Sequence, residues 1–187
     1  MGELMVISFT TLDGVIEDPD GSDGTPFGGW AMRQGPAAVA GDKFRLGPVL
    51  DTATLLFGRR TWEMFSQLWP RRDDPFSSRM NHAPKAVVTS RDLDTSPWSN
   101  STVVTDSVDE WVDDTRATTD VVTIGSNQLV AHLMAAGLVD EYRLLTFPVV
   151  VGSGRHLFTE PVTLRLVSSE ATEYAVLTTL RPEGANA

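Results

Sequence analysis

Short apolar runs alternate with polar stretches along the chain, and this pattern predicts alternating strands and helices. The run over residues 5–9 predicts a buried strand, and the Asp-, Gly- and Pro-rich stretch over residues 18–26 predicts a long polar loop. Between residues 37 and 50, apolar residues recur loosely at helical spacing, although Gly41 and the pair Gly47-Pro48 weaken or bend the expected helix. Its apolar positions are Val39, Leu46, Val49 and Leu50.

Two further helices carry clearer signals. Ser107 followed by Glu110 forms a capping-box pattern, which predicts a helix over residues 107–116. Another helix is expected to follow Gly125 and to stop at Gly137. The apolar face of the first helix is Val108, Trp111 and Val112, and that of the second is Leu129, Val130, Leu133 and Met134.

The last part of the chain is rich in β-forming residues. Three stretches, residues 142–151, 164–169 and 174–180, predict strands, with turns at residues 152–154 and around Pro161. Strands that alternate with helices and end in a run of strands predict an α/β fold, with a mostly parallel sheet and an antiparallel C-terminal edge. The sequence shows no linker or repeat, so we expect one domain over residues 1–187.

Two turns lead from an apolar run directly into a helix. The first, Gly58-Arg59-Arg60-Thr61-Trp62, follows residues 55–57, and the second, Gly125-Ser126-Asn127-Gln128-Leu129, follows residues 121–124. A helix N-terminus presents unpaired N–H groups and the positive end of the helix dipole, and a small residue there lets the backbone approach an anion. Two such turns suit a dinucleotide, which has two phosphate regions.

Composition narrows the kinds of partner. The chain has 15 basic and 25 acidic residues, and this formal charge of −10 disfavours binding to nucleic acid or to an anionic membrane. It has no cysteine, no apolar stretch long enough to span a bilayer and no basic segment before its first apolar run, so we expect a cytoplasmic protein.

Three arginines and a serine are candidates for binding a phosphate group. Arg59 and Arg60 follow Gly58, and Ser90-Arg91 ends the next strand, so these side chains could converge on one side of the sheet. Guanidinium groups match phosphate geometry, which favours a 2′-phosphate and therefore NADP over NAD. Alternatively, the arginines are solvated surface residues. Thr61 could bind the pyrophosphate or be an ordinary first-turn residue, and Gly125 could serve only a tight strand-to-helix turn.

Six motifs in order resemble the dihydrofolate-reductase-like superfamily, and within it the branch typified by the C-terminal reductase domain of the riboflavin-biosynthesis deaminase-reductase (RibD). The similarity runs from about Met5 to Leu180. It implies a three-layer α/β fold, NADPH as hydride donor and a pyrimidine- or pteridine-like substrate. The motifs are Leu12-Asp13-Gly14-Val15-Ile16, Phe57-Gly58-Arg59-Arg60-Thr61-Trp62, Ala86-Val87-Val88-Thr89-Ser90-Arg91, Ile124-Gly125-Ser126, Gly137-Leu138-Val139-Asp140-Glu141 and Pro148-Val149-Val150-Val151-Gly152-Ser153-Gly154.

The resemblance also implies roles for residues outside the phosphate turns. In the folate-reducing members an acid on the helix before the Gly-Arg-x-Thr turn helps to protonate the pterin, and Asp42 lies at a matching distance with Phe44 beside it. Asp42 could instead be a solvated acid paired with Lys43 or Arg45. Asp13 either shapes a turn or contacts substrate. Ile16 and Trp30 are expected to contact the nicotinamide side or a lid, or to lie in the core.

The sequence therefore predicts an NADPH-dependent reductase of a small heterocyclic substrate, similar to the reductase of riboflavin biosynthesis but without an appended deaminase domain. Two alternatives stay open: a true dihydrofolate reductase, which requires Asp42 to face the cleft, and a non-catalytic nucleotide- or small-molecule-binding module on the same fold. The resembling reductases also imply a homodimer, formed through Phe147, Val149 and Val151 unless these are core residues. The histidines are scattered along the chain, which argues against a catalytic metal site. No glutamate closes the loop that contains Asp18, Asp20 and Asp23, which argues against a calcium site.

Overall fold

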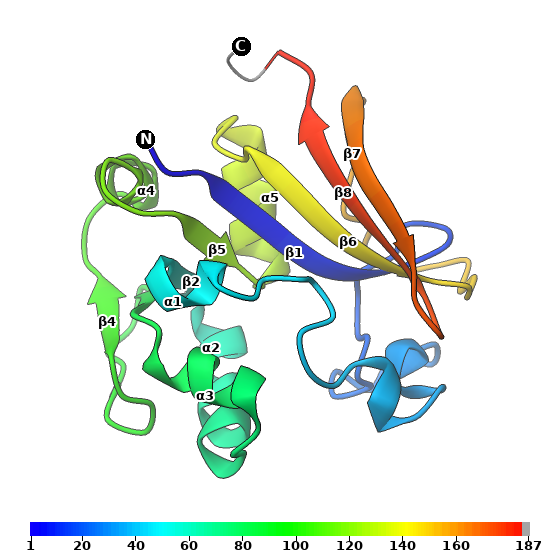
Figure 1. Cartoon of the computed structure of the whole chain (residues 1–187), viewed down its shortest axis with the longest axis horizontal. Helices are drawn as coiled ribbons and strands as arrows, with labels where there is room; N and C mark the ends of the chain where they lie inside the picture. Colours follow the sequence, from blue (N-terminus) through cyan, green and yellow to red (C-terminus); the bar gives the residue numbers. More distant parts are fainter. Residues whose placement is uncertain (185–187) are drawn as a thin grey trace. The chain divides into compact units, whose positions relative to one another are not determined.

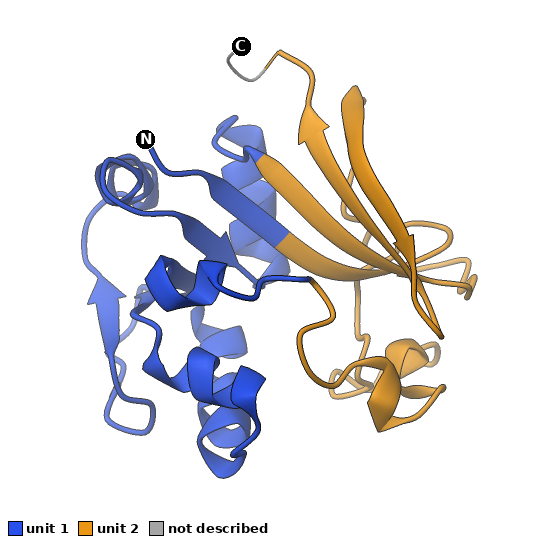
Figure 2. Cartoon of the chain, viewed as in Figure 1, with its two compact units in different colours: residues 1–6, 45–140 blue, residues 7–44, 141–187 orange. Residues whose placement is uncertain are grey.

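The computed structural model describes residues 1–184. Contacts between residues divide the chain into two compact units that alternate along the sequence (Figure 2). Unit 1 comprises residues 1–6 and 45–140, and unit 2 comprises residues 7–44 and the chain from residue 141 onward. The single domain expected from the sequence stays a prediction.

The fold is built on a mixed sheet with the strand order β4-β3-β2-β5-β1-β6-β8-β7 (Figure 1). In unit 1 the paired strands are all parallel, and in unit 2 strand β8 pairs antiparallel with both β6 and β7. The mostly parallel sheet with an antiparallel C-terminal edge is thereby confirmed. The strands are β1 (Leu4–Thr11), β2 (Thr54–Gly58), β3 (Lys85–Val88), β4 (Ser101–Val104), β5 (Val121–Thr123), β6 (Glu141–Phe147), β7 (Leu164–Ala171) and β8 (Val176–Pro182).

The structure confirms three of the four expected helices, namely α2 after the Gly58 turn, α4 and α5. Helices α4 and α5 form where predicted, although Ser107 makes no side-chain bond to the start of α4, so the predicted capping box is wrong. Every helix within residues 1–184 falls short of the length and apolar character of a membrane span. The helices are α1 (Val49–Thr52), α2 (Arg59–Leu68), α3 (Pro75–His82), α4 (Val108–Arg116) and α5 (Asn127–Ala135), with 3-10 turns η1 (Trp30–Met32), η2 (Pro36–Ala38) and η3 (Trp69–Arg71).

The helix predicted between residues 37 and 50 is wrong. Only η2 and the four-residue α1 form there, and the stretch between them is irregular. Gly41, Arg45 and Gly47 have φ angles of 75°, 54° and 44°. These left-handed conformations cannot continue a right-handed helix, so no helix forms despite the helical spacing of the apolar residues.

The centre of unit 1 is the buried parallel sheet, and one charged side chain is buried within it. Lys85, at the start of β3, donates from Nζ to the carbonyl oxygens of Asn81 and Ala83 at 2.9 and 2.6 Å, and its ammonium lies 4.6 Å from the ring centre of Trp98. Burial lowers the pKa of Lys85 to about 8. The side chain thus satisfies carbonyls at the C-terminal end of α3, which would otherwise be unpaired.

Asp140 joins the end of the α5 region to the first strand. Its Oδ2 atom accepts the N–H of Leu4 at 2.7 Å and a bond from Nη1 of Arg116 at 2.8 Å, and its own N–H donates to the Leu4 carbonyl at 3.0 Å. Arg116 is buried and also donates to the carbonyl of Leu138. Asp140 therefore compensates a buried cation and fixes the start of β1 at the same time.

Unit 2 is held by an aromatic cluster. The ring of Phe9 stacks on Phe44 with centres 5.2 Å apart, and Phe147 meets both Phe9 and Trp30 edge to face at 5.8 Å. Phe147 has no exposed surface. Of the two alternatives for this residue, the structure therefore supports the core. Val149 and Val151 are only partly buried, so their part in a dimer surface stays a prediction.

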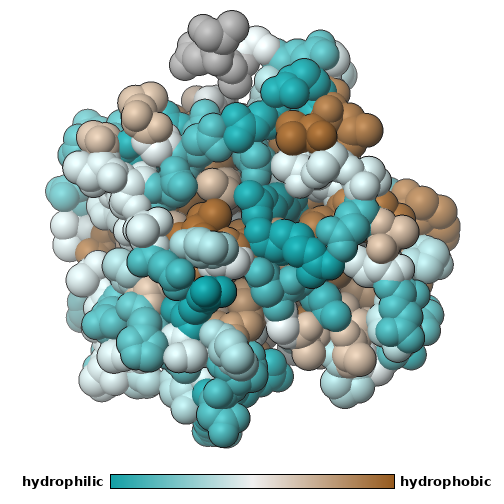
Figure 3. Space-filling model, viewed as in Figure 1, coloured by the Kyte–Doolittle hydropathy of each residue, from teal (hydrophilic) through white to brown (hydrophobic). Residues whose placement is uncertain are grey.

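Exposed apolar side chains of unit 2 lie both in the segment over residues 149–151 and in other parts of the unit. Val150, between Val149 and Val151, is exposed. Leu166 and Val167 on β7, Val176 on β8 and Val162 just before β7 are exposed, and apolar surface gathers over the start of β7 in Figure 3. Homodimer formation stays a prediction.

Replacing Asp140 with alanine tests the Asp140–Arg116 pair. Asp140→Ala removes the nearer of the two carboxylates that pair with the buried guanidinium of Arg116, and it leaves the N–H of Leu4 without its acceptor. We therefore expect a loss of about 2 kcal/mol in unfolding free energy. Urea denaturation measures the change. Asp114→Ala, an exposed acid on the same helix as Arg116, is the matched control and should change stability by no more than about 0.5 kcal/mol. Equal stability of the two variants would contradict the role given to Asp140.

Candidate functional site

Three of the predicted phosphate-binding segments meet at one edge of the sheet in unit 1. Strands β2 and β5 are parallel neighbours, so their C-terminal ends lie at the same edge, where α2 and α5 begin. Strand β3 pairs with β2 in parallel, with Val88 opposite Gly58, and residues 89–91 continue beyond that end. The topology therefore brings together segments that are far apart in the sequence.

The two strand-to-helix turns touch through Gly58. Its N–H donates to the carbonyl of Gly125 at 3.1 Å. A Cβ atom at position 58 would lie 2.3 Å from Oγ and 2.9 Å from Cβ of Ser126, well inside any real contact. A Cβ on Gly125 would lie 3.3 Å from Oγ1 of Thr61, and the φ of Gly125 is +113°. Glycine is thus required at both positions, by close approach and by backbone conformation.

Neither helix at this edge is capped by a side chain. Gly58 and Ser126 are the N-cap residues of α2 and α5, both have extended backbones, and neither gives a side-chain cap bond. Serine usually caps a helix with its hydroxyl, but the hydroxyl of Ser126 is directed instead at the space above Gly58. The N–H groups at the start of both helices can therefore donate hydrogen bonds to an oxyanion.

The segment at the start of α5 divides into two kinds of residue. Asn127 and Gln128 are partly or fully exposed, whereas the side chain of Leu129 is buried in the core. Leu129 can therefore contribute only its backbone N–H to a ligand.

The basic side chains lie near the same edge. Arg59 and Arg60 are the first two residues of α2, and Arg91 is an exposed residue three positions after β3. The hydroxyl of Thr89 accepts the N–H of Arg91 at 3.1 Å, which shapes the turn that carries Ser90. Arg59 donates from Nη1 to Oε1 of Glu63 at 2.7 Å. The sequence interpretation did not include Glu63, although its position four residues after Arg59 on one helix indicates such a pair.

This arrangement fits the phosphate groups of a dinucleotide. The close approach at Gly58 and Gly125 leaves the two helix N-termini free of side-chain caps, the hydroxyls of Thr61 and Ser126 lie beside the turns, and the arginines supply positive charge at the same edge. In a chain with a formal charge of −10, an anion would need such a local set of donors in order to bind.

Four of the predicted substrate or nicotinamide contacts lie in unit 2, and three of them are buried. Trp30 has no exposed surface and its Nε1 donates to the carbonyl of Glu17, while Ile16 and Phe44 are also buried. Trp30 is thus a core residue rather than a pocket wall, because a side chain without exposed surface cannot meet a ligand in this conformation.

Asp13 has a structural task. Its carboxylate accepts the hydroxyl of Thr11 at 2.6 Å and the N–H of Gly152 at 2.8 Å. These two bonds hold the pKa of Asp13 below its usual value of 3.8. These bonds support the turn-shaping role of Asp13, and substrate contact by this residue stays a prediction.

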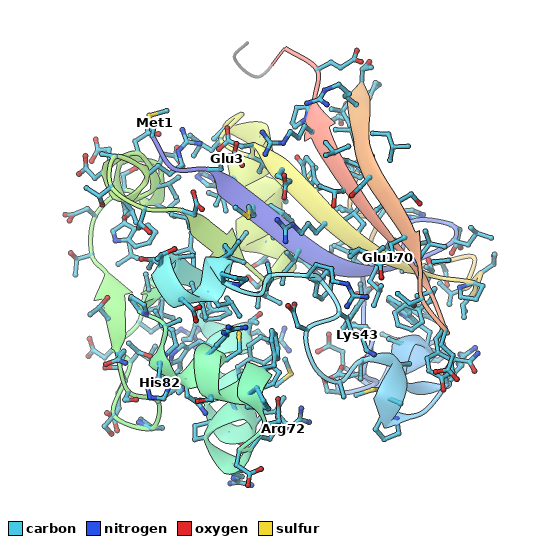
Figure 4. All side chains as sticks on the ribbon, viewed as in Figure 1. Met1, Glu3, Lys43, Arg72, His82 and Glu170 are labelled. Carbon is cyan, nitrogen blue, oxygen red and sulfur yellow. The ribbon has the colours of Figure 1, made fainter. Side chains whose placement is uncertain are left out.

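Asp42 does not lie on a helix. It is partly buried on the irregular stretch after η2, next to Lys43, which Figure 4 labels on that stretch. The helix that does precede the Gly58 turn is α1, and its acid, Asp51, is exposed and accepts from Nε of Arg79 at 3.0 Å. The expectation that Asp42 is presented from a helix is wrong, because Gly41 and Arg45 on either side of it have left-handed backbones.

Within residues 1–184, no three histidine or acidic side chains gather as metal ligands. The carboxylate of Asp18 in the polar loop is already used, since it accepts the N–H groups of Asp23 and Thr25 and the hydroxyl of Thr25 at 2.8 to 2.9 Å. The carboxylate of Asp18 therefore organises the loop over residues 18–26 through hydrogen bonds within the loop.

The contact between Gly58 and Ser126 can be tested by exchanging the small residue. Gly58→Ala should lower the unfolding free energy by about 1 to 3 kcal/mol, because the new methyl group overlaps the Ser126 side chain. Adding Ser126→Gly removes both overlapping side-chain atoms and should restore at least half of the loss. Thermal denaturation of the two single variants and the double variant gives the comparison, and purely additive effects would show that the two positions do not interact.

Comparison with known proteins agrees with this geometry. Residues 3–178 match the family described as RibD C-terminal domain. Among solved structures, a Shewanella sp. PV-4 protein named for riboflavin biosynthesis is similar with a TM-score of 0.72 and 19% identity, over 97% of this chain and 99% of that one. Dihydrofolate reductase from Enterococcus faecalis, solved with NADP(H), gives a TM-score of 0.56 and 19% identity over 97% of each chain. A diaminohydroxyphosphoribosylaminopyrimidine deaminase/5-amino-6-(5-phosphoribosylamino)uracil reductase from Thermotoga maritima gives 0.60 and 17%, over 97% of this chain and 56% of that one.

At these identities the structural neighbours establish the fold, which is that of the dihydrofolate reductases. The family match covers nearly the whole described chain, including both strand-to-helix turns. The chain belongs to the RibD C-terminal domain family.

Proposed function

We propose that the protein is an NADPH-dependent reductase of a small pyrimidine-like heterocycle, similar in reaction to 5-amino-6-(5-phosphoribosylamino)uracil reductase. The observation that carries the proposal is the contact of the two turns at Gly58 and Ser126, which brings two uncapped helix N-termini and a group of arginines to one edge of the sheet. The reductase activity named for the Thermotoga maritima relative and the NADP(H) bound to the Enterococcus faecalis relative support the choice of reaction and cofactor.

In this proposal the residues of the two turns bind and orient the dinucleotide. The N–H groups at the start of α2 and α5 and the hydroxyls of Thr61 and Ser126 receive the pyrophosphate. Arg59 and Arg91, with Arg60 and Ser90 beside them, receive the 2′-phosphate that distinguishes NADPH from NADH. The bound cofactor supplies the hydride, and the protein supplies orientation and phosphate contacts.

The pyrimidine substrate is preferred to a folate on one structural ground. The folate hypothesis relied on an acid presented by the helix before the Gly58 turn, whereas Asp42 lies on an irregular stretch and the helical acid Asp51 is paired with Arg79 at the surface. Asp42 remains the proposed proton donor, with its position set by the irregular stretch instead of by a helix.

The cofactor assignment makes a quantitative prediction. NADPH should bind at least about tenfold more tightly than NADH, which corresponds to about 1.4 kcal/mol, because only NADPH offers the 2′-phosphate. Arg59→Ala should remove most of this preference while leaving NADH affinity within about twofold. Isothermal titration calorimetry with both nucleotides measures the two affinities.

Arg165, an exposed arginine on β7, provides the control for Arg59→Ala. Arg165→Ala removes the same charge and should leave both affinities unchanged. Equal affinity of the unmodified protein for NADPH and NADH would overturn the cofactor assignment. A loss of both affinities in Arg59→Ala together with a lowered melting temperature would indicate a folding defect.

Exchange of Asp42 tests the catalytic part of the proposal. Asp42→Asn should lower turnover by about a hundredfold or more without changing NADPH affinity, which is the usual effect of removing a positioned acid. Oxidation of NADPH is followed with 5-amino-6-(5-phosphoribosylamino)uracil, with the dephosphorylated form of this compound and with dihydrofolate. Unchanged turnover would exclude Asp42 as the acid, turnover of dihydrofolate alone would establish the folate alternative, and tight NADPH binding without any turnover would favour the binding module.

A further inference from the structure

The pair formed by Arg59 and Glu63 has a specific place on α2. Arg59 is the first residue of the helix and Glu63 lies one turn later, on the same side. The Nη1–Oε1 distance is 2.7 Å, and the two side chains are 33% and 41% exposed. The pair therefore lies at the surface, beside the turn that begins at Gly58.

We propose that Glu63 is a positioning residue for NADPH, holding the guanidinium of Arg59 in the orientation that receives the 2′-phosphate. This inference rests on the proposed function. Only Nη1 of Arg59 is used by Glu63, so the other N–H groups of the guanidinium can donate to phosphate oxygens. Because the guanidinium of Arg59 is planar and Glu63 holds it at Nη1, its remaining N–H donors point in a fixed direction.

The pair contributes more to binding than to folding. An exposed ion pair four residues apart on a helix adds little to stability, and salt screens it. For binding, however, a free arginine side chain must give up rotamer freedom when it meets a phosphate, and a side chain that is already held gives up less. The effect of Glu63 is therefore expected in NADPH affinity, with the melting temperature nearly unchanged.

The negative charge of the Glu63 carboxylate acts against NADPH binding. A negative group near a bound phosphate repels it, so the hydrogen bond favours NADPH while the charge disfavours it. Glutamine separates the two effects, because its amide oxygen can still accept from Nη1 of Arg59 and it carries no charge. Alanine removes both.

The affinity for NADPH and for NADH, measured by calorimetry, tests the proposal. Glu63→Ala should weaken NADPH binding about fivefold and leave NADH binding within twofold, whereas Glu63→Gln should keep NADPH binding within about twofold of the unmodified protein. Glu110→Ala, which removes an exposed acid from α4, is the matched control and should change neither affinity.

A double-variant cycle with Arg59 separates this inference from the proposed function. In the Arg59→Ala background, Glu63→Ala should have no further effect on the NADPH to NADH affinity ratio, because the group that Glu63 positions is gone. If Arg59→Ala lowers the ratio and Glu63→Ala does not, the inference is overturned while the cofactor assignment stands. If Arg59→Ala leaves the NADPH to NADH affinity ratio unchanged, the cofactor assignment and the role of Glu63 are both overturned.

Two further results would also overturn the role of Glu63. One is equal weakening of NADPH and NADH binding in Glu63→Ala, which would indicate a structural effect on α2. The other is NADPH binding that becomes more than threefold tighter in Glu63→Gln, which would show that the charge of Glu63 selects against NADPH instead of its hydrogen bond favouring it.

Discussion

The contact between Gly58 and Ser126 is the constraint on which the candidate site depends. Because β2 and β5 are parallel neighbours, their following helices start at the same edge, and the missing side chain at Gly58 lets the second turn lie against the first. A larger residue at position 58 would separate the turns. The uncapped N-termini of α2 and α5 would then lie farther apart, and the arginines at the start of α2 would be displaced from Arg91.

The buried charges of the chain serve the fold rather than the chemistry. Lys85 satisfies carbonyls at the end of α3, and Asp140 compensates Arg116. Glu141, buried at the start of β6, accepts bonds from Arg143 at 2.8 Å and Arg181 at 2.9 Å. Burying a charge is costly unless polar or charged groups compensate it. Arg116 and Glu141 have partners of opposite charge, whereas Lys85 is compensated by carbonyl oxygens and the ring of Trp98. The Asp-Glu pair that helped to define the family resemblance therefore reflects a structural requirement, and it does not mark the reaction centre.

The candidate site follows a different physical rule, in which polar groups lie at the surface and keep free bonding capacity. The hydroxyl of Ser126 does not cap its own helix, and Arg59 uses only one nitrogen in its pair with Glu63. Such groups are of little value to the stability of the fold. They are suited to a ligand that arrives with its own negative charge, which fits a reaction whose electron transfer is supplied by a cofactor.

Local sequence patterns were sufficient for several of the regular elements and for the two strand-to-helix turns. The apolar runs of β1, β2 and β5 and the helical spacing of α4 and α5 each depend on near neighbours in the chain, so they could be predicted without the tertiary structure. The same holds for the Arg59–Glu63 pair, whose spacing of four residues was present in the sequence and was overlooked.

Positions that depend on distant residues could only be decided by the tertiary structure. The apolar spacing between residues 37 and 50 was compatible with a helix, but the left-handed backbones at Gly41, Arg45 and Gly47 prevent it. Whether Trp30 and Phe147 line a surface or fill a core depends on which rings pack against them, and they pack against each other. The sequence by itself determined most of the strands, three of the helices and the position of the two strand-to-helix turns, because those arise from local periodicity and backbone chemistry. Only the tertiary structure decided that Asp13 and Asp140 are structural and that Ser126 lies against Gly58, because these contacts join residues that are far apart along the chain.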